Sequence, residues 1–242
     1  MIKPRVLIAA AGKGLRAGLP YPKTLFPLQG KPILVRIYDV LSDVDDHPTI
    51  IVSPAGYEPI LACLSRYKLS ADLVVQPEAR GMGNAVLRFK DSPVFHDTDH
   101  VVLIWGDIPF IQRQTVTAMI KNHYAQGYDF TFVTRNVDKA YTVVTRDKQG
   151  RVTGVVESRE EGIQDPKAGE RDIGLFIFRK QPVFDLLDEE LPGKWGKTTG
   201  EHGFLYVIHH LAKRGYRVQG LPIATELDLI SLNTMNDIKG FQ

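Results

Sequence analysis

The chain has 242 residues, of which 43% are hydrophobic and 24% charged, the balance of an ordinary globular protein. Its formal net charge of +2 is too small to indicate bulk attraction to nucleic acid or to an anionic membrane, and no run approaches the roughly 18 apolar residues of a membrane helix. The only cysteine, Cys63, excludes an internal disulfide, and the first residues lack a signal-peptide pattern, so we expect a cytoplasmic protein without a nucleic-acid or membrane partner.

Strand-like and helix-like segments alternate along the first part of the chain. The expected strands cover residues 5–11, 49–53, 72–76, 100–105 and 129–134, and the expected helices cover residues 33–41, 58–67, 83–89 and 115–124. This order predicts an α/β fold in which a mostly parallel sheet carries helices on both faces.

The pattern changes to closely spaced strands after Arg135. Strands are expected at 141–146, 152–157, 173–179 and 217–221, with a hairpin turn at 148–150 and helices near 184–187 and 204–213. The polar stretch 159–171 predicts a mobile surface loop, and residues 192–200 predict an exposed loop. We expect one domain over residues 1–242.

The first strand ends in small residues, two glycines and several cations. Glycine at 12 and 14 lets backbone N–H groups approach an anion closely, and Lys13, Arg16 and Lys23 add positive charge nearby. Backbone donors combined with Arg and Lys suit a polyphosphate, so the segment predicts a nucleotide-phosphate loop. The alternative is an ordinary turn with solvated basic residues.

Two better-known glycine motifs do not fit. The spacing of Gly12, Gly14 and Ala17 matches a dinucleotide fingerprint, but Gly18, Pro20 and Pro22 forbid the helix that should follow, and no carboxylate closes the second strand. The stretch 196–198 has the end of a P-loop, but Leu191 stands where that motif requires glycine.

Polar residues follow the later strands, where open parallel sheets bind ligands. Asp107 comes after the fourth strand, and a carboxylate beside a triphosphate loop usually holds Mg²⁺. Because Ile108 and Pro109 follow, Asp107 could instead cap a helix. Gln76 carries a donor and an acceptor that could read a nucleobase edge, with Asn84 a candidate cap, although a plain strand–turn–helix fits too.

Several blocks together resemble the sugar-1-phosphate nucleotidyltransferase family. They are residues 10–16 with Pro22 and Lys23, then 27–32, Gln76 with 81–85, 105–109, 154–157 and 232–234, in the family's order over nearly the whole chain. The greatest likeness is to the uridylyltransferase domain of bacterial UDP-N-acetylglucosamine pyrophosphorylases. The chain stops soon after Asn233, so the β-helix acetyltransferase domain of those bifunctional enzymes is not expected.

The resemblance implies a fold, a reaction and partners. The fold is a Rossmann-like, nucleotide-diphospho-sugar transferase-like α/β sheet with a smaller β-rich acceptor-binding lobe. Its nucleotide-binding half spans about residues 1–135, and its acceptor-binding half spans residues 136–242. The reaction is Mg²⁺-dependent transfer of UMP from UTP to a sugar 1-phosphate, with release of pyrophosphate.

The resemblance also assigns roles to individual positions. Arg16 and Lys23 are implied as catalytic, and Asp107 and Asn233 as Mg²⁺ ligands. The implied nucleotide-binding residues are Ala10, Ala11, Gly12, Lys13, Gly14, Gln76, Gly81, Met82 and Gly106, and the implied acceptor-binding residues are Thr142, Glu157, Arg159 and Asp172.

The acceptor side departs most from the family pattern. Thr142 replaces a glycine, Asp172 replaces an asparagine, and the segment 202–206 replaces one that bears tyrosine and threonine. These changes predict that N-acetylglucosamine 1-phosphate is a poorer acceptor than a non-acetylated, hydroxyl-rich phosphate. A cytidylyltransferase acting on a polyol or amino-alcohol phosphate and a non-catalytic nucleotide-sugar sensor are the alternatives, and the base, acceptor and oligomeric state stay open.

Overall fold

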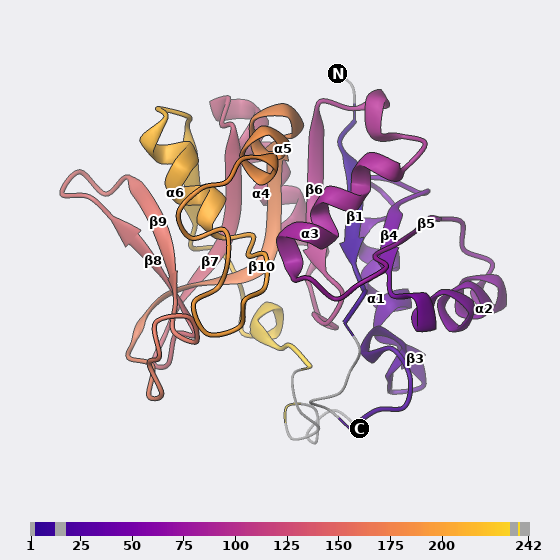
Figure 1. Ribbon diagram of the computed structural model, residues 1–242. Helices are drawn as coiled ribbons and strands as arrows, with labels where there is room; N and C mark the ends of the chain where they lie inside the picture. The colour runs from indigo at the N-terminus through magenta and orange to yellow at the C-terminus, as the bar shows by residue number, and fades with distance from the viewer. Residues whose placement is uncertain (1–2, 13–17, 233–236, 238–242) are drawn as a thin grey trace.

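The computed structural model describes residues 3–12, 18–232 and 237. Its centre is a seven-stranded sheet in the order β11-β7-β10-β6-β1-β4-β5 (Figure 1). The strands are β1 (Arg5–Ala9), β4 (Thr49–Val52), β5 (Asp72–Val75), β6 (His100–Trp105), β7 (Phe130–Val137), β10 (Gly169–Arg179) and β11 (Val218–Leu221). All strands of this sheet run in one direction except β10, which is antiparallel to both β6 and β7.

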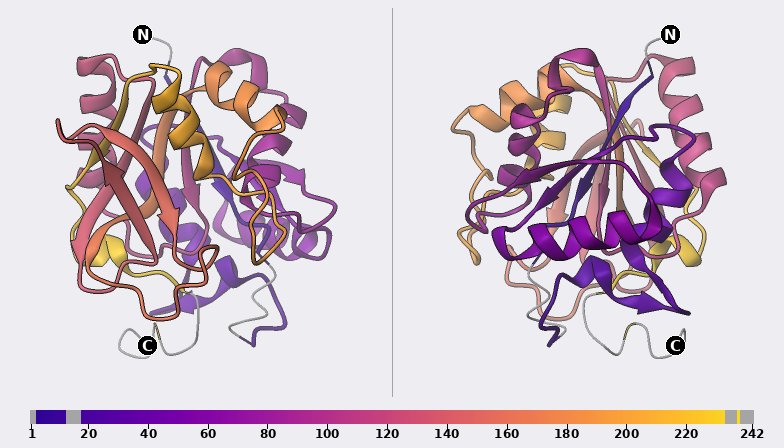
Figure 2. Two further views of the ribbon diagram at one scale, coloured as in Figure 1. Left: turned by 60° about the vertical axis from the view of Figure 1, so that its left-hand side comes forward. Right: turned by 90° about the vertical axis from the view of Figure 1, so that its right-hand side faces the viewer.

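Helices cover both faces of the sheet, as Figures 1 and 2 show. One core holds the apolar sides of α1 (Ile33–Leu41), α2 (Tyr57–Tyr67) and α4 (Arg113–Gln126), and the other holds those of α3 (Met82–Leu87), α5 (Lys180–Asp188) and α6 (Tyr206–Lys213). Within β1, Val6 and Ile8 enter the first core, whereas Leu7 enters the second. Successive side chains of a strand point to opposite faces, so the continuous apolar run is explained by burial on both sides.

A hairpin of β8 (Thr142–Arg146) and β9 (Val152–Glu157) extends from the second half of the chain (Figure 1). Its turn closes with a hydrogen bond from the Gly150 N–H to the Asp147 carbonyl at 2.9 Å, and Gly150 takes the positive φ of 79° that this turn requires. The remaining short elements are β2 (Pro27–Leu28), β3 (Lys31–Pro32), η2 (Lys23–Leu25), η3 (Pro54–Gly56), η4 (Arg88–Asp91), η5 (Phe95–Asp97) and η6 (Leu227–Leu229).

The α/β prediction is confirmed, with local corrections. The first strand ends at Ala9, not at residue 11. The predicted loop 159–171 is wrong at its end, because residues 169–171 open β10 and pair with β7. The charged residues of this segment concealed the strand, and in the structure Glu170 of β10 accepts hydrogen bonds from Arg146 of β8. The predicted exposed loop 192–200 contains a buried side chain, Lys194, which is 5% exposed.

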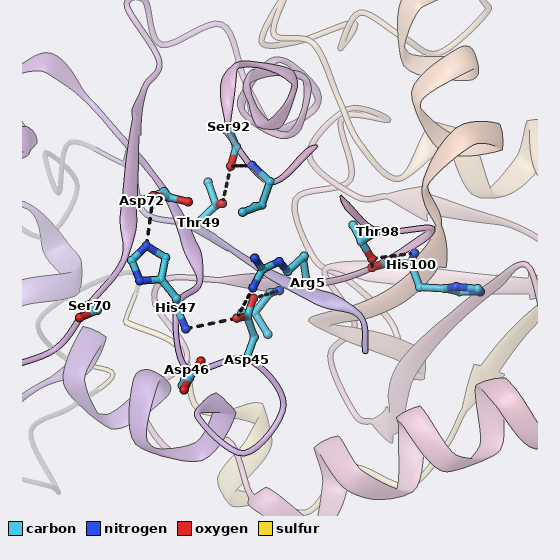
Figure 3. A network of polar contacts seen from close by, with 12 residues as sticks. Arg5, Asp45, Asp46, His47, Thr49, Ser70, Asp72, Ser92, Thr98 and His100 are labelled. Atoms are coloured by element: carbon cyan, nitrogen blue, oxygen red, sulfur yellow. Dashed lines mark hydrogen bonds and ion pairs between the residues drawn. The ribbon is translucent and has the colours of Figure 1, made fainter. Parts of the chain in front are cut away.

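A polar network joins the amino ends of the strands (Figure 3). Asp45 accepts a hydrogen bond from Arg5 at 3.0 Å and another from the Val6 N–H at 2.9 Å. Next to it, His47 lies 3.1 Å from Asp72 at the start of β5. A cavity of about 330 Å³ opens here, lined by Lys3, Pro4, Arg5, Ser42, Val44, Asp45, Asp46 and Asp97. The contacts of this polar network join the amino ends of the strands. The opposite, carboxyl ends are where open parallel sheets bind ligands.

None of the helices in the described residues is both long enough and apolar enough to cross a membrane.

Candidate active site

A cavity of about 680 Å³ opens at the carboxyl ends of β1 and β6. Both halves of the chain contribute to its wall. From the first half come Ala9, Ala10, Ala11, Gly12, Lys23, Thr24, Gln76, Ala79, Gly81, Met82, Ala85, Trp105, Gly106 and Asp107. The second half adds Val155, Val156, Glu157, Arg159, Glu160, Glu161, Gly193, Trp195, Gly196, Lys197, Thr199, Glu201 and residues 202–206.

The start of the predicted phosphate loop lies in this wall. Ala10, Ala11 and Gly12 line the cavity, and an added Cβ at Gly12 would meet no atom of the described residues within 4 Å. The open space at Gly12 fits the prediction that a ligand approaches its backbone. Lys13, Gly14 and Arg16 lie outside the described residues.

Gly106 is required for a reason that the sequence did not reveal. Its N–H donates to the Ala9 carbonyl at 2.9 Å, and an added Cβ would lie 2.8 Å from that same oxygen. The missing side chain thus serves the contact between the ends of β6 and β1. Gly106 also lines the cavity, and its contact with a nucleotide stays a prediction.

Lys23 and Asp107 meet in the cavity wall. The Lys23 Nζ donates to Asp107 Oδ2 at 2.6 Å, and both side chains are largely buried. The other carboxylate oxygen, Oδ1, is buried and has no hydrogen-bond partner among the described residues. The alternative of a helix cap is wrong, because α4 begins only at Arg113 with Gln112 in the N-cap position.

The end of the described chain reaches the same place. The Leu232 N–H donates to the Asp107 carbonyl at 2.9 Å. Asn233, the other predicted metal ligand, lies outside the described residues. Among the residues that the structure describes, no group of three or more His, Cys, Asp or Glu side chains is arranged to hold a metal ion.

Gln76 is held in a fixed orientation at the end of β5. Its Nε2 donates to the Gly81 carbonyl at 3.1 Å and to Asn84 Oδ1 at 2.9 Å. A carbonyl can only accept, so the amide nitrogen faces Gly81 and the Gln76 Oε1 is left to accept from a ligand. The prediction that Asn84 caps the helix is wrong, because α3 has Gly81 at its N-cap and Asn84 lies within the helix.

Close backbone contacts join the start of α3 to the second half of the chain. The Gly83 N–H donates to the His202 carbonyl at 2.9 Å, and the His202 N–H donates to the Arg80 carbonyl at 2.7 Å. An added Cβ at Gly81 would lie 2.5 Å from the His202 carbonyl. These contacts hold the start of α3, where Gly81 and Met82 line the cavity, against the segment around His202.

Glu157 is the most strongly perturbed acid of the cavity. Its pKa is raised to about 7, chiefly by burial and further by the nearby Asp172, Glu160 and Glu201 carboxylates, against the opposing charge of Arg159. Arg159 also lines the cavity and is exposed to solvent. A carboxyl group with this pKa changes between accepting and donating hydrogen bonds near neutral pH.

Thr142 and Asp172 contact each other behind Glu157. The Thr142 hydroxyl donates to Asp172 Oδ1, and the Gly174 N–H donates to Asp172 Oδ2 at 3.0 Å. Asp172 is 2% exposed, burial raises its pKa, and Thr142 pairs with Glu157 across the hairpin. Neither residue is among those that line the cavity, so their predicted contact with an acceptor stays a prediction.

The loop between α5 and α6 supplies lining residues that sequence reasoning missed. Glu160 accepts hydrogen bonds from the Thr198 N–H at 2.8 Å and the Thr199 hydroxyl at 2.9 Å, and so fastens this loop to the one after β9. Trp195 is 48% exposed at the cavity. The sequence feature that could have identified this part of the cavity wall is a tryptophan within a polar, glycine-containing loop.

Comparisons with known proteins identify the family of the chain. Residues 6–210 match the family model described as a MobA-like NTP transferase domain. The protein "Bifunctional protein GlmU" of Heliobacterium modesticaldum is 28% identical over 236 residues, which are 97% of this chain and 50% of that protein. That of Clostridioides difficile is 28% identical over 188 residues, 76% of this chain and 39% of that protein. The chain thus spans about half or less of the length of these curated relatives.

A solved structure shares the fold. It is a crystal structure from Bacillus anthracis described as a glucose-1-phosphate thymidylyltransferase, and it matches with a TM-score of 0.77 and 19% sequence identity. The match covers 98% of this chain and 92% of that one.

Proposed function

The chain belongs to the MobA-like NTP transferase domain family, and we propose that it transfers UMP from UTP to a sugar 1-phosphate and releases pyrophosphate. The observation that carries this proposal is the largely buried Lys23–Asp107 pair, which lines the same cavity as Glu157. A cation and a carboxylate on one side suit a nucleoside triphosphate, and a carboxyl group on the other suits an acceptor rich in hydroxyl groups.

Transfer at an α-phosphate needs alignment and charge neutralisation more than covalent help from the protein. In our proposal Lys23 stabilises charge on the leaving pyrophosphate, together with Lys13 and Arg16. The Gln76 Oε1 accepts a hydrogen bond from the pyrimidine, because its Nε2 is already bound to Gly81 and Asn84. Uracil presents an N3–H for that contact.

The residues of the described site fit a divalent cation. The Asp107 Oδ1 is buried without a partner, and carboxylate oxygens are the ligands that Mg²⁺ prefers. We therefore assign Asp107 and Asn233 as the residues that hold Mg²⁺, with Leu232 bonded to the Asp107 carbonyl. When bound there, Mg²⁺ would neutralise phosphate charge and orient the triphosphate.

The acceptor half favours hydroxyl groups over an acetamido group. The unpaired acids at this side of the cavity are Glu157 and Glu201, as far as the described contacts show. Glu201, and Glu157 in its ionised form, accept from hydroxyls but provide no donor for an acetamido carbonyl. We therefore propose that N-acetylglucosamine 1-phosphate is a poorer acceptor than glucose 1-phosphate.

Pyrophosphate release tests the proposal. The purified protein is incubated with Mg²⁺, each of the four common ribonucleoside triphosphates and, in turn, glucose 1-phosphate, N-acetylglucosamine 1-phosphate, ribitol 5-phosphate or phosphocholine. UTP with a hexose 1-phosphate should give the highest kcat/KM. Activity confined to CTP with ribitol 5-phosphate or phosphocholine would establish the cytidylyltransferase alternative, and nucleotide binding without turnover in any pair would indicate a sensor.

A further inference from the structure

Trp195 is exposed but firmly held. Its indole Nε1 donates to Glu190 Oε2 at 3.0 Å, and its backbone forms an antiparallel bridge with His202. Nevertheless the residue is 48% exposed and lines the cavity of the candidate site. A large aromatic surface left in water at a cavity, with its polar nitrogen already bonded, is typical of a ligand contact.

The loop that carries Trp195 is anchored on the side away from the cavity. The Lys194 side chain is buried, and its Nζ donates to the Glu189 carbonyl at 3.0 Å and to Glu190 Oε1 at 2.8 Å, just beyond the end of α5. Glu190 therefore binds both Lys194 and the indole of Trp195. This arrangement orients the ring before any ligand arrives, which lowers the entropy lost on binding.

Gly203 lies between the backbone before Trp195 and the Glu157 carboxyl group. The Gly203 N–H donates to the Lys194 carbonyl at 2.8 Å. A Cβ added to Gly203 would lie 3.7 Å from that carbonyl oxygen and 3.9 Å from Glu157 Oε1. The backbone next to Trp195 and the Glu157 carboxyl group therefore both border the same position that has no side chain, and Glu157 and Trp195 line one cavity.

The charges around the indole decide which ligand fits. Aromatic faces bind cations and apolar ring faces, but the Lys194 Nζ already lies 5.8 Å from the centre of the Trp195 ring. Lys194, whose charge Glu190 balances, therefore already takes the place of a cation at this ring, and a ring face of the ligand is the remaining partner for the indole. The His202 ring lies 5.3 Å from the indole, and burial, together with Lys194, lowers the His202 pKa to about 4, so His202 is neutral at physiological pH.

From this geometry we infer that Trp195 is a specificity-determining residue of the acceptor site, where its indole packs against the C–H face of the acceptor's sugar ring while Glu157 binds the ring hydroxyls. Glu190 is the positioning residue that orients the indole. This inference rests on the proposed function, because it assigns the acceptor of that reaction.

Indole N–H resonances test the inference without turnover. The chain has two tryptophans, so protein labelled with ¹⁵N-tryptophan gives two indole signals, and Trp195→Phe identifies that of Trp195. Glucose 1-phosphate, added with Mg²⁺ and a non-hydrolysable UTP analogue, should shift the Trp195 signal beyond the effect of the analogue alone. Phosphocholine should leave it unmoved.

Kinetics separate ring packing from structural damage. Trp195→Ala should raise the acceptor KM roughly 3- to 10-fold, the range expected for losing one aromatic contact, with the UTP KM unchanged. Trp195→Phe should restore most of the affinity. Glu190→Ala should also raise the acceptor KM, and Glu190→Gln should partly restore it, because an amide oxygen still accepts the indole N–H. Tyr141→Ala is the matched control, since Tyr141 is 61% exposed and is absent from the cavity lining.

The outcomes distinguish the inference from the proposed function. If UTP and glucose 1-phosphate release pyrophosphate but the Trp195 signal and the acceptor KM of Trp195→Ala do not change, the inference fails and the function stands. A shift caused by phosphocholine alone would overturn the sugar-ring assignment. If no sugar 1-phosphate is used and none moves the Trp195 signal, both proposals fall.

Discussion

Lys23 and Asp107 are 84 residues apart in the chain, yet their side chains form an ion pair in the candidate site. Each neutralises the other when no ligand is bound, because a largely buried carboxylate is costly without a partner. A phosphate would compete for Lys23, and a cation would compete for Asp107. The pair therefore holds both groups ready for the ligands that we propose.

Removing either member of the pair should impair turnover by a different route. Lys23→Ala should lower kcat roughly 10²- to 10³-fold, the usual loss for one donor to developing charge. Asp107→Asn should instead raise the Mg²⁺ concentration needed for half-maximal activity, since an amide binds a hard cation more weakly than a carboxylate. Steady-state kinetics over a Mg²⁺ series checks both, with circular dichroism as the folding control. Unchanged kcat/KM in Lys23→Ala at saturating Mg²⁺ would remove Lys23 from the mechanism.

The protonation of Glu157 makes the stability of the folded protein depend on pH. Its pKa in the folded protein is about 7, above the ordinary value of 4.5, so the folded state binds this proton more tightly than the unfolded state. Stability therefore falls as the pH rises from about 4.5 to about 7, and it stays lowered above that range.

Replacing Glu157 should reverse this loss. We expect Glu157→Gln to have a higher Tm than the wild type at pH 8, and the difference should vanish near pH 4.5 because the folded wild type is then already protonated at this position. Thermal melts across this pH range test the expectation. Glu226→Gln is the control, because the Glu226 side chain is 89% exposed. A Tm difference that did not depend on pH would contradict the assigned pKa.

Among the elements, α3 depends most on what the rest of the fold brings against it. It has only six residues and no side-chain cap, so its own hydrogen bonds cannot hold it in place. Its first turn is instead bonded to the segment around His202. The glycines at 81 and 83 belong to this contact as well as to any nucleotide contact.

Gly83→Ala should therefore destabilise the fold. An added Cβ would lie 2.0 Å from the Gly203 carbonyl oxygen, so the two segments must separate. We expect a loss of about 1–3 kcal/mol in the free energy of unfolding, as for an overpacked core. Urea denaturation measures it, with Gly154→Ala as a control whose added Cβ would meet its nearest neighbours at 3.4 Å. Equal stability of the two variants would mean that the α3 contact is looser than described.

Across the whole molecule, the two ends of the sheet have separate tasks. The carboxyl ends of β1 and β6 open into the large cavity, whereas the amino ends are joined by the network around Asp45. Among the described residues, the site contains polar atoms without hydrogen-bond partners, such as Asp107 Oδ1, whereas the network at the amino ends lies away from any ligand in the cavity and stabilises the sheet.

This division predicts that stability and activity can be changed independently. Asp45→Asn should lower the free energy of unfolding by about 1–3 kcal/mol, because it weakens bonds to Arg5 and the Val6 N–H, while kcat/KM stays near the wild-type value. Asp46→Asn is the matched control, since Asp46 is exposed beside it. A large fall in kcat/KM in folded Asp45→Asn protein would show that the two ends are coupled.

The sequence by itself determined the features that depend on neighbouring residues. The apolar runs of β1 and β6 and the periodic pattern of α1 predicted strands and a helix close to their observed bounds, because burial on both faces or on one face leaves a local pattern. The family motifs likewise identified the kind of enzyme domain, since each motif is a short block of neighbouring residues.

Only the tertiary structure decided what depends on residues far apart in the chain. The pairing of Lys23 with Asp107, the position of Thr142 and Asp172 behind Glu157, and the raised pKa of that acid all arise from long-range contacts. The same holds for Trp195, whose place at the cavity is set by Glu190 and His202. A sequence pattern records which side chain is present, but its charge state, its partner and its exposure are set by whatever the fold packs around it.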